Sequence, residues 1–438
     1  MADHRVAVIG AGPCGLPACK TLDEFGIDYE CLEARPEIGG IWNVEHGPGG
    51  GYRSLHTNTP TGGMAFSDFP FDEASPVYPS AEEMLRYFRA YAERFGLNER
   101  IRFGHAVRRA RPIEGGGWRV ELEAGGTREY EALVIATGQY NSPRRPHASI
   151  PGEFSGEHLH VFDYLDPASP VDCRGKRVVV VGLGSSAAEL AVDLSDPSSR
   201  VGSAAQVVLS ARSGRWVLPK ITDAGPDAAR AIHPATPVPA ALRWLPGESG
   251  AWLMRRMMAR MLRAQSAKFG GATALGLPEP DIEPWEDRPT MSIGFIPALQ
   301  AGRIDVRPGI RAFEGSTIHF DDDSRCEADV IVYATGYRLD FPFLEDETLG
   351  CQAPELSLYQ RIAHPDYDDL FFLGCCRVMC SLWPLAEQQS RWVARLLSGA
   401  FALPSQKKRT RKAVPLAASL PVMCGLYVES LRKEAHGL

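Results

Sequence analysis

The fold is decided by the stretch Val6-Ala7-Val8-Ile9-Gly10-Ala11-Gly12-Pro13-Cys14-Gly15, close to the start of the chain. Its four apolar residues predict a buried strand, and its three spaced glycines predict a tight turn into a helix. Gly10 permits the sharp turn, Gly12 lets the backbone approach a phosphate, and Gly15 lets the helix pack closely on the strand. Because the first turn of a helix carries free N–H groups, this segment can receive a pyrophosphate.

The residues that follow this turn also fit a nucleotide site. Glu33 lies about 18 residues after Gly15, at the end of the next predicted strand. A carboxylate there can accept hydrogen bonds from both hydroxyls of a ribose. Gly40 and Trp42 come next in Gly39-Gly40-Ile41-Trp42, where the chain must pass close to a bound cofactor. We therefore predict a dinucleotide site on Gly10, Gly12, Gly15, Glu33, Gly40 and Trp42.

A second copy of the pattern occurs at Val178-Val179-Val180-Val181-Gly182-Leu183-Gly184-Ser185-Ser186-Ala187. Here no acid ends the following strand, and Arg212 and Ser213 stand in its place. A guanidinium and a hydroxyl suit a 2′-phosphate, which a carboxylate would repel, so the sequence favours NADPH over NADH. Arg215 and Lys220 are either further phosphate partners or ordinary surface cations. The second site is thus predicted on Gly182, Gly184, Ser185, Ser186, Arg212 and Ser213.

Two dinucleotides in one chain usually exchange electrons, which points to a flavin, FAD, that is reduced by NADPH. The predicted fold class is α/β, with two Rossmann-like dinucleotide-binding domains and the NADPH domain inserted into the FAD domain. We expect residues 1–165 and 325–438 to form the FAD domain. Residues 170–325 form the NADPH domain, with a helical insertion at about 222–290. Ala-Thr-Gly ends both crossover strands, which adds Thr137, Gly138, Thr335 and Gly336 to the predicted cofactor-binding residues.

Composition excludes several classes of function. The 438 residues are 44% hydrophobic and 23% charged, and the net charge of −7 gives no reason to expect a nucleic-acid partner. No apolar run reaches about 20 residues and no signal peptide precedes the first strand, so we expect no membrane contact and a cytoplasmic location. The ten cysteines lack paired metal-ligand spacing, which predicts no metal and reduced, mostly buried thiols.

Two further segments give structural expectations. The basic run at 407–412 is read as a solvated loop. Residues 251–265 have the spacing of an amphipathic helix, and its methionines are typical of core or of a subunit contact. A homodimer through 250–265 is therefore possible.

One family resemblance covers nearly the whole chain. The spacing Phe154-x-Gly156-x-x-x-His160-x-x-x-Tyr164 resembles the fingerprint of flavin-containing monooxygenases, in which it couples the two domains. The loops 54–60 and 66–71 and the segment 386–391, which contains Gln389, also match. The resemblance implies that NADPH reduces FAD and that O2 adds to give a flavin 4a-hydroperoxide. An amine nitrogen or a sulfide sulfur then takes the distal oxygen.

The same resemblance places Thr57 beside the cofactor and Asn58 in front of the flavin, where the amide can hydrogen-bond the peroxy oxygen or the substrate. The alternative for Asn58 is a cap on the turn before Pro60. For His160, the alternative to proton chemistry is a hydrogen bond to the linker. Cys14 and Thr61 replace a serine and a lysine that are common in the family, and both changes could weaken cofactor contacts.

Three other functions stay open. Baeyer–Villiger oxygenation of ketones is the first, although Tyr164-Leu165 departs from the Trp-Pro or Trp-Asp of those enzymes. A pyridine-nucleotide disulfide reductase would need a cysteine pair after Gly39-Gly40, where this chain has Ile41-Trp42; Cys14 and Cys19 have the spacing but lie on the FAD helix. A non-catalytic flavoprotein redox sensor is the third. No motif identifies the substrate.

Overall fold

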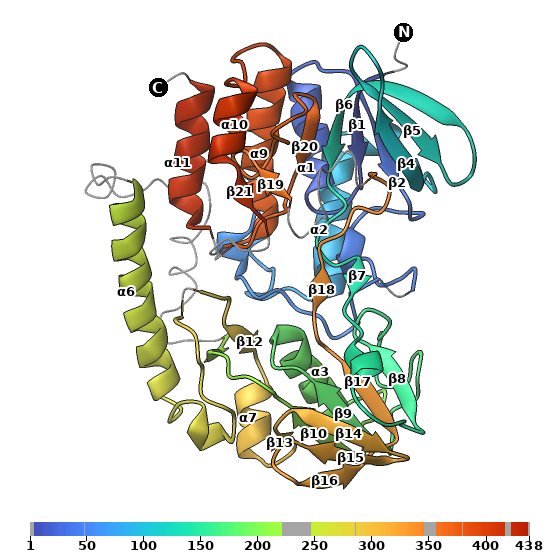
Figure 1. Cartoon of the computed structure of the whole chain (residues 1–438), viewed down its shortest axis with the longest axis vertical. Helices are drawn as coiled ribbons and strands as arrows, with labels where there is room; N and C mark the ends of the chain where they lie inside the picture. Colours follow the sequence, from blue (N-terminus) through green and yellow to red (C-terminus); the bar gives the residue numbers. More distant parts are fainter. Residues whose placement is uncertain are drawn as a thin grey trace.

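The computed structural model describes residues 4–47, 49–220, 247–284, 286–345, 356–378, 380–416 and 422–436. Figure 1 shows two lobes, one above the other, each built around its own sheet. The first lobe contains a seven-stranded sheet of order β3-β2-β1-β6-β5-β4, with β20 paired to β6. Its strands are β1 (His4–Ile9), β2 (Tyr29–Glu33), β3 (Ile101–Phe103), β4 (Val107–Pro112), β5 (Trp118–Leu122), β6 (Thr127–Ile135) and β20 (Leu370–Phe372).

The centre of this sheet is parallel, as predicted for a nucleotide-binding fold. β1 lies between β2 and β6, with Val8 opposite Cys31 on one side and Val134 on the other. These strands are buried on both faces, which explains the unbroken apolar runs Val6–Ile9 of β1 and Ala132–Ile135 of β6. Because the three strands are parallel, their carboxyl ends meet at one edge, where the first glycine turn begins.

The second lobe repeats the design with a five-stranded parallel sheet of order β13-β10-β9-β17-β8. All of its strands lie between β6 and β20 in the sequence, so the second sheet is inserted into the first. Figure 1 shows a small antiparallel sheet at its lower end. The strands of the second lobe are β8 (Glu157–His160), β9 (Arg177–Val181), β10 (Gln206–Ser210), β13 (Asp305–Arg307) and β17 (Val330–Tyr333), with β14 (Ile310–Glu314), β15 (Thr317–Phe320) and β16 (Arg325–Glu327) in the small sheet.

Helices cover both sheets. α2 begins at Ser80, whose hydroxyl accepts from the Glu83 N–H while the Glu83 carboxylate accepts from the Ser80 N–H, a reciprocal capping box. α1 begins at Gly15, directly after the first glycine turn. The helices are α1 (Gly15–Glu24), α2 (Ala81–Arg94), α3 (Ser185–Ser195), α6 (Gly247–Ala267), α7 (Phe295–Gln300), α9 (Leu382–Leu397), α10 (Gln406–Lys412) and α11 (Cys424–Ala435).

Two short crossings join the lobes. β7 (Ser142–Pro143) pairs antiparallel with β18 (Tyr337–Arg338), and both lie between the two sheets in Figure 1. Other short pairs are β11 (Val217–Pro219) with β12 (Thr290–Ser292), and β19 (Ser357–Leu358) with β21 (Val414–Pro415). The boundaries of the two domains, as residue numbers, stay predictions.

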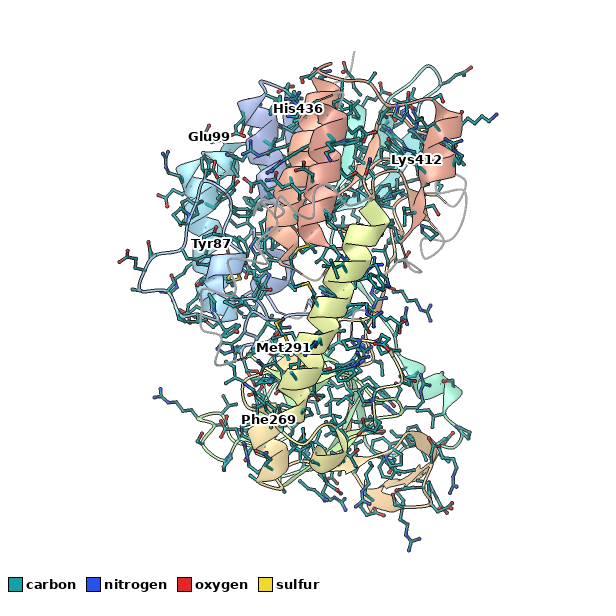
Figure 2. The ribbon with its side chains drawn as sticks, turned by 90° about the vertical axis from the view of Figure 1, so that its left-hand side faces the viewer. Tyr87, Glu99, Phe269, Met291, Lys412 and His436 are labelled. Carbon is teal, nitrogen blue, oxygen red and sulfur yellow. A yellow bond between two sulfur atoms is a disulfide. The ribbon has the colours of Figure 1, made fainter. Side chains whose placement is uncertain are left out.

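The long helix α6 runs along the side of the molecule, across both lobes in Figure 2. It confirms the helix predicted over 251–265, whereas part of the predicted insertion, 221–246, lies outside the described residues. Trp252, Met257 and Met261 are 56%, 64% and 59% exposed. Of the two alternatives expected for this helix, core or subunit contact, the exposure of these three side chains excludes the core, and the subunit contact stays a prediction.

The basic run at 407–412 is helical rather than a loop. It forms most of α10, and Arg409 is buried there. Its guanidinium pairs with Asp368 and donates to the Pro365 carbonyl oxygen at 3.0 Å. Burial of a cation needs such partners, and a charge count along the sequence does not show them.

The prediction that all cysteines are reduced thiols is wrong at one pair. Cys380 and Cys424 form a disulfide that joins the segment before α9 to the first residue of α11. Seven other cysteines in the described part of the chain are free, and most of these are buried. Burial raises the pKa of the Cys14 thiol to about 12, which makes it unreactive.

The disulfide gives a stability prediction. It closes a loop whose ends are 44 residues apart in sequence, and cross-linking such a loop restricts the unfolded chain. Reduction should therefore lower the free energy of unfolding by about 2–4 kcal/mol. Urea unfolding with and without reductant measures this difference, and the Cys380→Ser, Cys424→Ser double variant is the control that should not respond to reductant. Equal stability of the oxidised and reduced protein would contradict the prediction.

Candidate active site at the two glycine turns

The first glycine turn has the shape of a phosphate cradle. Gly10 adopts a φ of 104°, and a Cβ at Gly15 would lie 1.8 Å from the Gly10 carbonyl oxygen. A Cβ at Gly12 would lie 3.6 Å from the Cα of Gly40, so the two predicted cofactor glycines face each other across a narrow gap. No acid occupies the first turn of α1. The first turn of α1 therefore offers backbone N–H groups to an anion without an acidic side chain of its own.

Glu33 ends β2 beside this turn, as predicted. Its Oε2 accepts from the Ala11 N–H at 2.6 Å and its Oε1 accepts from the Arg35 N–H at 2.8 Å. Burial raises the pKa of Glu33, although the N–H groups of Arg35 and Ala11 act in the opposite direction. Each carboxylate oxygen keeps a second lone pair, which fits an acceptor for ribose hydroxyls.

Two buried hydroxyls test whether the residues present fit a bound cofactor. Among the described residues, nothing hydrogen-bonds the Oγ1 of Thr57 or the Oγ1 of Thr137. Both threonines were predicted to bind the cofactor, and Thr137 lies two residues after the end of β6. Buried polar atoms normally have a partner, so two orphan hydroxyls together with the glycine cradle fit a polar ligand at this place. Gly138 turns the chain away from the site with a φ of 83°.

Asn58 lies next to Thr57 and is exposed. Within the part of the chain that the structure describes, its side chain makes no hydrogen bond. The structure therefore does not show the alternative in which the Asn58 side chain caps the turn before Pro60. The loop itself is fixed, because the Thr57 N–H donates to the Pro79 carbonyl oxygen at 2.9 Å and the Thr61 N–H donates to that of Val77 at 2.9 Å. The side-chain amide of Asn58 is thus free to bind a ligand, while hydrogen bonds fix the backbone of its loop.

The second glycine turn lies at the equivalent edge of the second sheet. Gly182 adopts a φ of 126°, and its N–H donates to the Ser210 carbonyl oxygen at 2.9 Å. α3 starts just after Gly184, where a Cβ would meet nothing within 4 Å, so the space above the helix start is open. Ser185 and Ser186 form the first turn of α3, which carries no acid.

Arg212 and Ser213 are both exposed just beyond β10, where an approaching phosphate can reach them. The other two cations are placed differently. Arg215 pairs with Asp287 at 2.6 Å, and Asp287 also pairs with Arg377. Lys220 is buried and ion-paired with Glu189, so neither reading made for it from sequence, phosphate partner or surface cation, is correct.

Trp42 and Gln389 lie behind the first turn rather than in an open site. Trp42 is buried, with its ring 5.8 Å from that of Trp383 in an edge-to-face contact. The Oε1 of Gln389 accepts from the Gly374 N–H at 2.9 Å and its Nε2 donates to the Tyr427 hydroxyl at 3.0 Å. Direct cofactor contacts of these two residues stay predictions.

Thr335 and Gly336 lie at the crossing between the lobes. The Thr335 hydroxyl donates to the Arg144 carbonyl oxygen at 2.5 Å, and the Arg144 N–H donates to the Gly336 carbonyl oxygen at 3.0 Å. Gly336 has a φ of 83°, as Gly138 does in the other Ala-Thr-Gly segment. These bonds tie the two crossing segments together, and the cofactor role of Thr335 and Gly336 stays a prediction.

Three of the four fingerprint residues, Phe154, His160 and Tyr164, are buried. A Cβ at Gly156 would lie 2.5 Å from the ring of Phe154 and 2.4 Å from the Asp329 carbonyl oxygen. Tyr164 donates to Asp193 of α3 at 2.8 Å. His160 is fully buried at the end of β8, and its Nδ1 accepts from the Phe162 N–H at 3.0 Å. This geometry supports the linker role of His160 over proton chemistry.

The state of His160 gives a pH prediction. Burial, and then the nearby Arg145, lower the pKa of His160 from 6.5 to about 4. Between these values the unfolded chain binds a proton that the folded chain does not, so the free energy of unfolding decreases as the pH falls from 6.5 towards 4. Neutral His160 contributes fully to the free energy of unfolding above pH 6.5. About 2 kcal/mol of this free energy is lost between pH 7 and pH 5.

Urea unfolding at pH 7 and pH 5 measures this loss in the unmodified protein and in His160→Asn. The asparagine keeps an acceptor for the Phe162 N–H but cannot titrate. We expect a smaller pH dependence in the variant. The same pH dependence in both proteins would show that His160 does not titrate as described.

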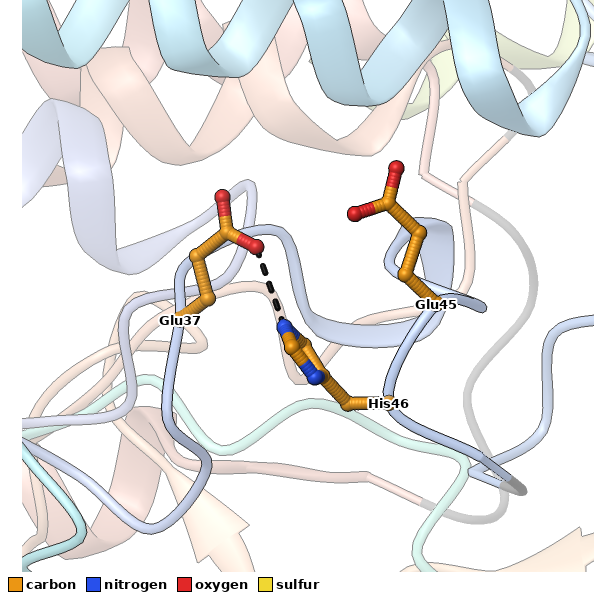
Figure 3. Close-up of side chains that lie close together, drawn as sticks. All are labelled: Glu37, Glu45 and His46. Carbon is orange, nitrogen blue, oxygen red and sulfur yellow. Dashed lines mark hydrogen bonds and ion pairs between the residues drawn. The ribbon is translucent and has the colours of Figure 1, made fainter.

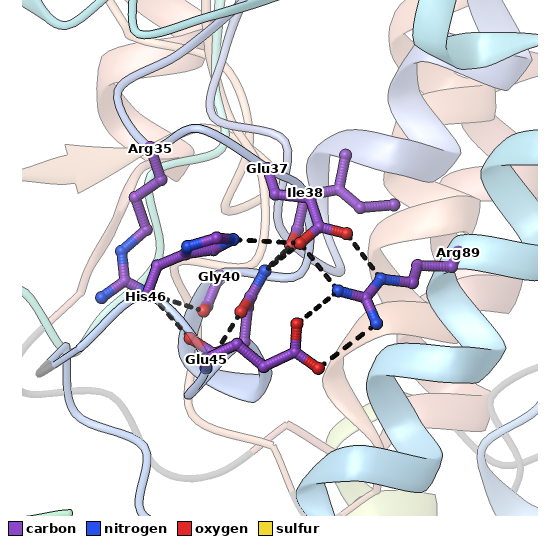
Figure 4. Close-up of polar contacts among 8 residues, drawn as sticks. Arg35, Glu37, Ile38, Gly40, Glu45, His46 and Arg89 are labelled. Carbon is purple, nitrogen blue, oxygen red and sulfur yellow. Dashed lines mark hydrogen bonds and ion pairs between the residues drawn. The ribbon is translucent and has the colours of Figure 1, made fainter.

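A cluster of acids lies beside Gly40, outside the predicted sites. Glu37, Glu45 and His46 place one ligand atom each within 4.8 Å of one another (Figure 3). Figure 4 shows that Arg89 of α2 forks between the two carboxylates, with its Nη2 2.7 Å from an oxygen of each. Arg89 also lowers the pKa of Glu37 to about 2. The guanidinium of Arg89 occupies oxygens of both carboxylates, so the cluster clamps the loop at 37–46 to α2 and gives no support for a metal site.

Two nucleotide cradles of this kind, on two sheets of which the second is inserted into the first, are typical of a flavoprotein oxidoreductase with a nicotinamide site. The comparisons with known proteins agree. Residues 3–418 match the family described as flavin-binding monooxygenase-like. A dimethylaniline monooxygenase [N-oxide-forming] 2 of Pan troglodytes is 33% identical over 436 residues, which are 94% of this chain and 78% of that protein.

Solved structures show the same fold. The structure of S-allyl-L-cysteine S-oxygenase from Allium sativum superposes with a TM-score of 0.68 at 22% identity, covering 99% of this chain and 88% of that one. The OTEMO complex with FAD and NADP gives a TM-score of 0.73 at 18% identity, covering 100% and 98%. The chain belongs to the flavin-binding monooxygenase family, and it is an FAD- and NADPH-dependent oxidoreductase.

Proposed function

We propose that the chain transfers one oxygen atom from O2 to the nitrogen of an amine or the sulfur of a sulfide, with NADPH as reductant. The observation that carries this proposal is the free amide of Asn58, exposed beside the orphan hydroxyl of Thr57. An N-oxide-forming relative at 33% identity supports the same reaction class. The disulfide reductase alternative has no support, because Cys14 and Cys19 are free, buried thiols on and beside α1.

In this proposal, FAD when bound accepts the hydride and activates O2. The backbone at Gly12 and Gly40 approaches its pyrophosphate, and Glu33 accepts from its ribose. The N–H groups of the first turn of α3 receive the pyrophosphate of NADPH, while Arg212 and Ser213 bind its 2′-phosphate. The Asn58 amide donates a hydrogen bond to the reacting oxygen or to the substrate.

A product screen tests the proposal. Tertiary amines, primary amines, thioethers and ketones are incubated with the FAD-loaded protein, NADPH and O2, and mass spectrometry detects the gain of one oxygen. We expect N- or S-oxides. Lactones or esters from ketones would instead identify Baeyer–Villiger oxygenation, and hydrogen peroxide alone under every substrate would favour a redox sensor. Either result would overturn the proposed reaction.

A homodimer through 250–265 and a cytoplasmic location are further proposals. Exposed Trp252, Met257 and Met261 on α6 support a contact surface there, because large apolar side chains on a surface often mark an interface. Sedimentation velocity of the unmodified protein and of Met257→Lys tests the dimer: a monomer in both would exclude it.

No helix among the described residues is long and apolar enough to span a bilayer.

A further inference from the structure

A buried ion pair lies where the second lobe meets the loop that carries Asn58. The side chains of Lys220 and Glu189 are 1% and 9% exposed, and the Lys220 ammonium pairs with the Glu189 carboxylate. The other oxygen of Glu189 accepts from the Tyr52 hydroxyl at 2.6 Å. Burial of the two charged groups costs free energy, because both leave water, and their mutual attraction must offset that cost. The elements that the pair connects therefore indicate its role.

The partners of this pair come from both nucleotide-binding units. Glu189 lies on α3, the helix whose first turn is predicted to receive NADPH. Tyr52 and His56 lie on the segment of the first lobe that runs directly into Thr57 and Asn58. Lys220 donates to the His56 carbonyl oxygen at 3.4 Å, two residues before Asn58. The pair thus connects the NADPH helix to the backbone of the Asn58 loop.

Neighbouring contacts on α3 reinforce the same connection. One turn beyond Glu189, Asp193 accepts from Ser54 at 2.8 Å and from Tyr164 of the fingerprint at 2.8 Å. One face of α3 therefore holds the segment at 52–56 through several polar contacts.

We propose that Lys220 is a positioning residue for oxygen transfer: it holds the Asn58 loop against the NADPH helix, so that reduced cofactor, O2 and substrate meet in a closed site. The proposal rests on the proposed function. When the site is closed, NADPH, H⁺, O2 and substrate give NADP⁺, water and the oxygenated product. When the loop is released, water enters and NADPH, H⁺ and O2 give NADP⁺ and H2O2 instead.

Lys220→Met tests this because it keeps the length of the side chain and removes its charge and its donors. Without substrate, we expect the variant to release H2O2 at least about fivefold faster than the unmodified protein. The anaerobic rate of FAD reduction by NADPH should stay within about twofold of that of the unmodified protein, since Lys220 belongs to neither predicted phosphate-binding site. Lys220→Arg keeps a cation and should recover most of the slow H2O2 release.

Two controls separate positioning from folding. Lys20→Met removes another buried lysine, on α1, whose ion-pair partners are Asp68 and Glu24 and not the segment at 52–56, and it should leave H2O2 release unchanged. The Glu189→Gln, Lys220→Met double variant leaves no unpaired buried charge, so it should recover thermal stability without recovering slow H2O2 release.

The proposal is overturned if folded, FAD-containing Lys220→Met releases H2O2 at the unmodified rate. It is also overturned if the double variant recovers both stability and slow release, because the role of Lys220 would then be structural alone. The rate of H2O2 release without substrate does not depend on the proposed function. If the protein oxygenates no amine or sulfide, the proposed function is refuted, but the H2O2 rates still decide the role of Lys220.

Discussion

Asn58→Ala is expected to retain FAD and its reduction by NADPH, and to form oxygenated product about a hundredfold more slowly. The reason is that an amide donor aimed at a reacting oxygen stabilises the charge that develops there. Asn58 is suited to this role because it is exposed and its side chain has no hydrogen-bond partner in the described part of the chain.

The measurement is product formed per NADPH oxidised, together with FAD content and the anaerobic reduction rate. Asn58→Asp is a sharper test than alanine, because a carboxylate of nearly the same shape accepts hydrogen bonds but cannot donate them. Asn98→Ala, at an exposed asparagine in the short helix Leu97–Glu99, is the matched control and should behave as the unmodified protein. Unchanged product per NADPH in Asn58→Ala would remove Asn58 from the mechanism.

Arg212→Ala is expected to raise the KM for NADPH at least tenfold, because loss of a charge-assisted phosphate contact costs about 1.4 kcal/mol or more. Arg212 is exposed beyond the end of β10, where the corresponding acid of an NADH site would stand. The KM for NADH should change little, since NADH lacks the 2′-phosphate.

Arg215→Ala provides the matched control for this substitution. Its guanidinium is already held by Asp287 at 2.6 Å, so its removal should raise the KM for NADPH less than removal of Arg212 does. Steady-state kinetics of Arg212→Ala and of Arg215→Ala, each with NADPH and with NADH, gives the four KM values to compare. Equal use of NADH and NADPH by the unmodified protein would contradict a 2′-phosphate site at Arg212.

The parts of the fold that sequence predicts are those fixed by local constraints. Glycine spacing around Gly10 and Gly182 identifies both turns because positive φ angles and close approaches demand glycine there. Apolar runs such as Val178–Val181 identify parallel strands buried on both faces. The insertion of one sheet into the other follows from the order of these strands along the chain.

What sequence does not show depends on contacts between distant residues. A lone lysine has no periodic pattern, so the burial of Lys220 against Glu189 becomes visible only when α3 and the segment at 52–56 come together. The Arg89 clamp on Glu37 and Glu45 and the Cys380–Cys424 disulfide are of the same kind. The orphan hydroxyls of Thr57 and Thr137 likewise appear only once the surrounding chain is placed.

We propose that FAD bound at the first glycine turn is reduced by NADPH bound at the second. Anaerobic addition of NADPH to the purified protein, followed through the visible absorption of oxidised flavin, tests this directly. We expect equimolar FAD whose absorption is bleached by NADPH, and bleached much less readily by NADH. Protein that contains no FAD and cannot be reconstituted with it, or whose bound FAD stays oxidised with NADPH, would refute the proposed electron transfer.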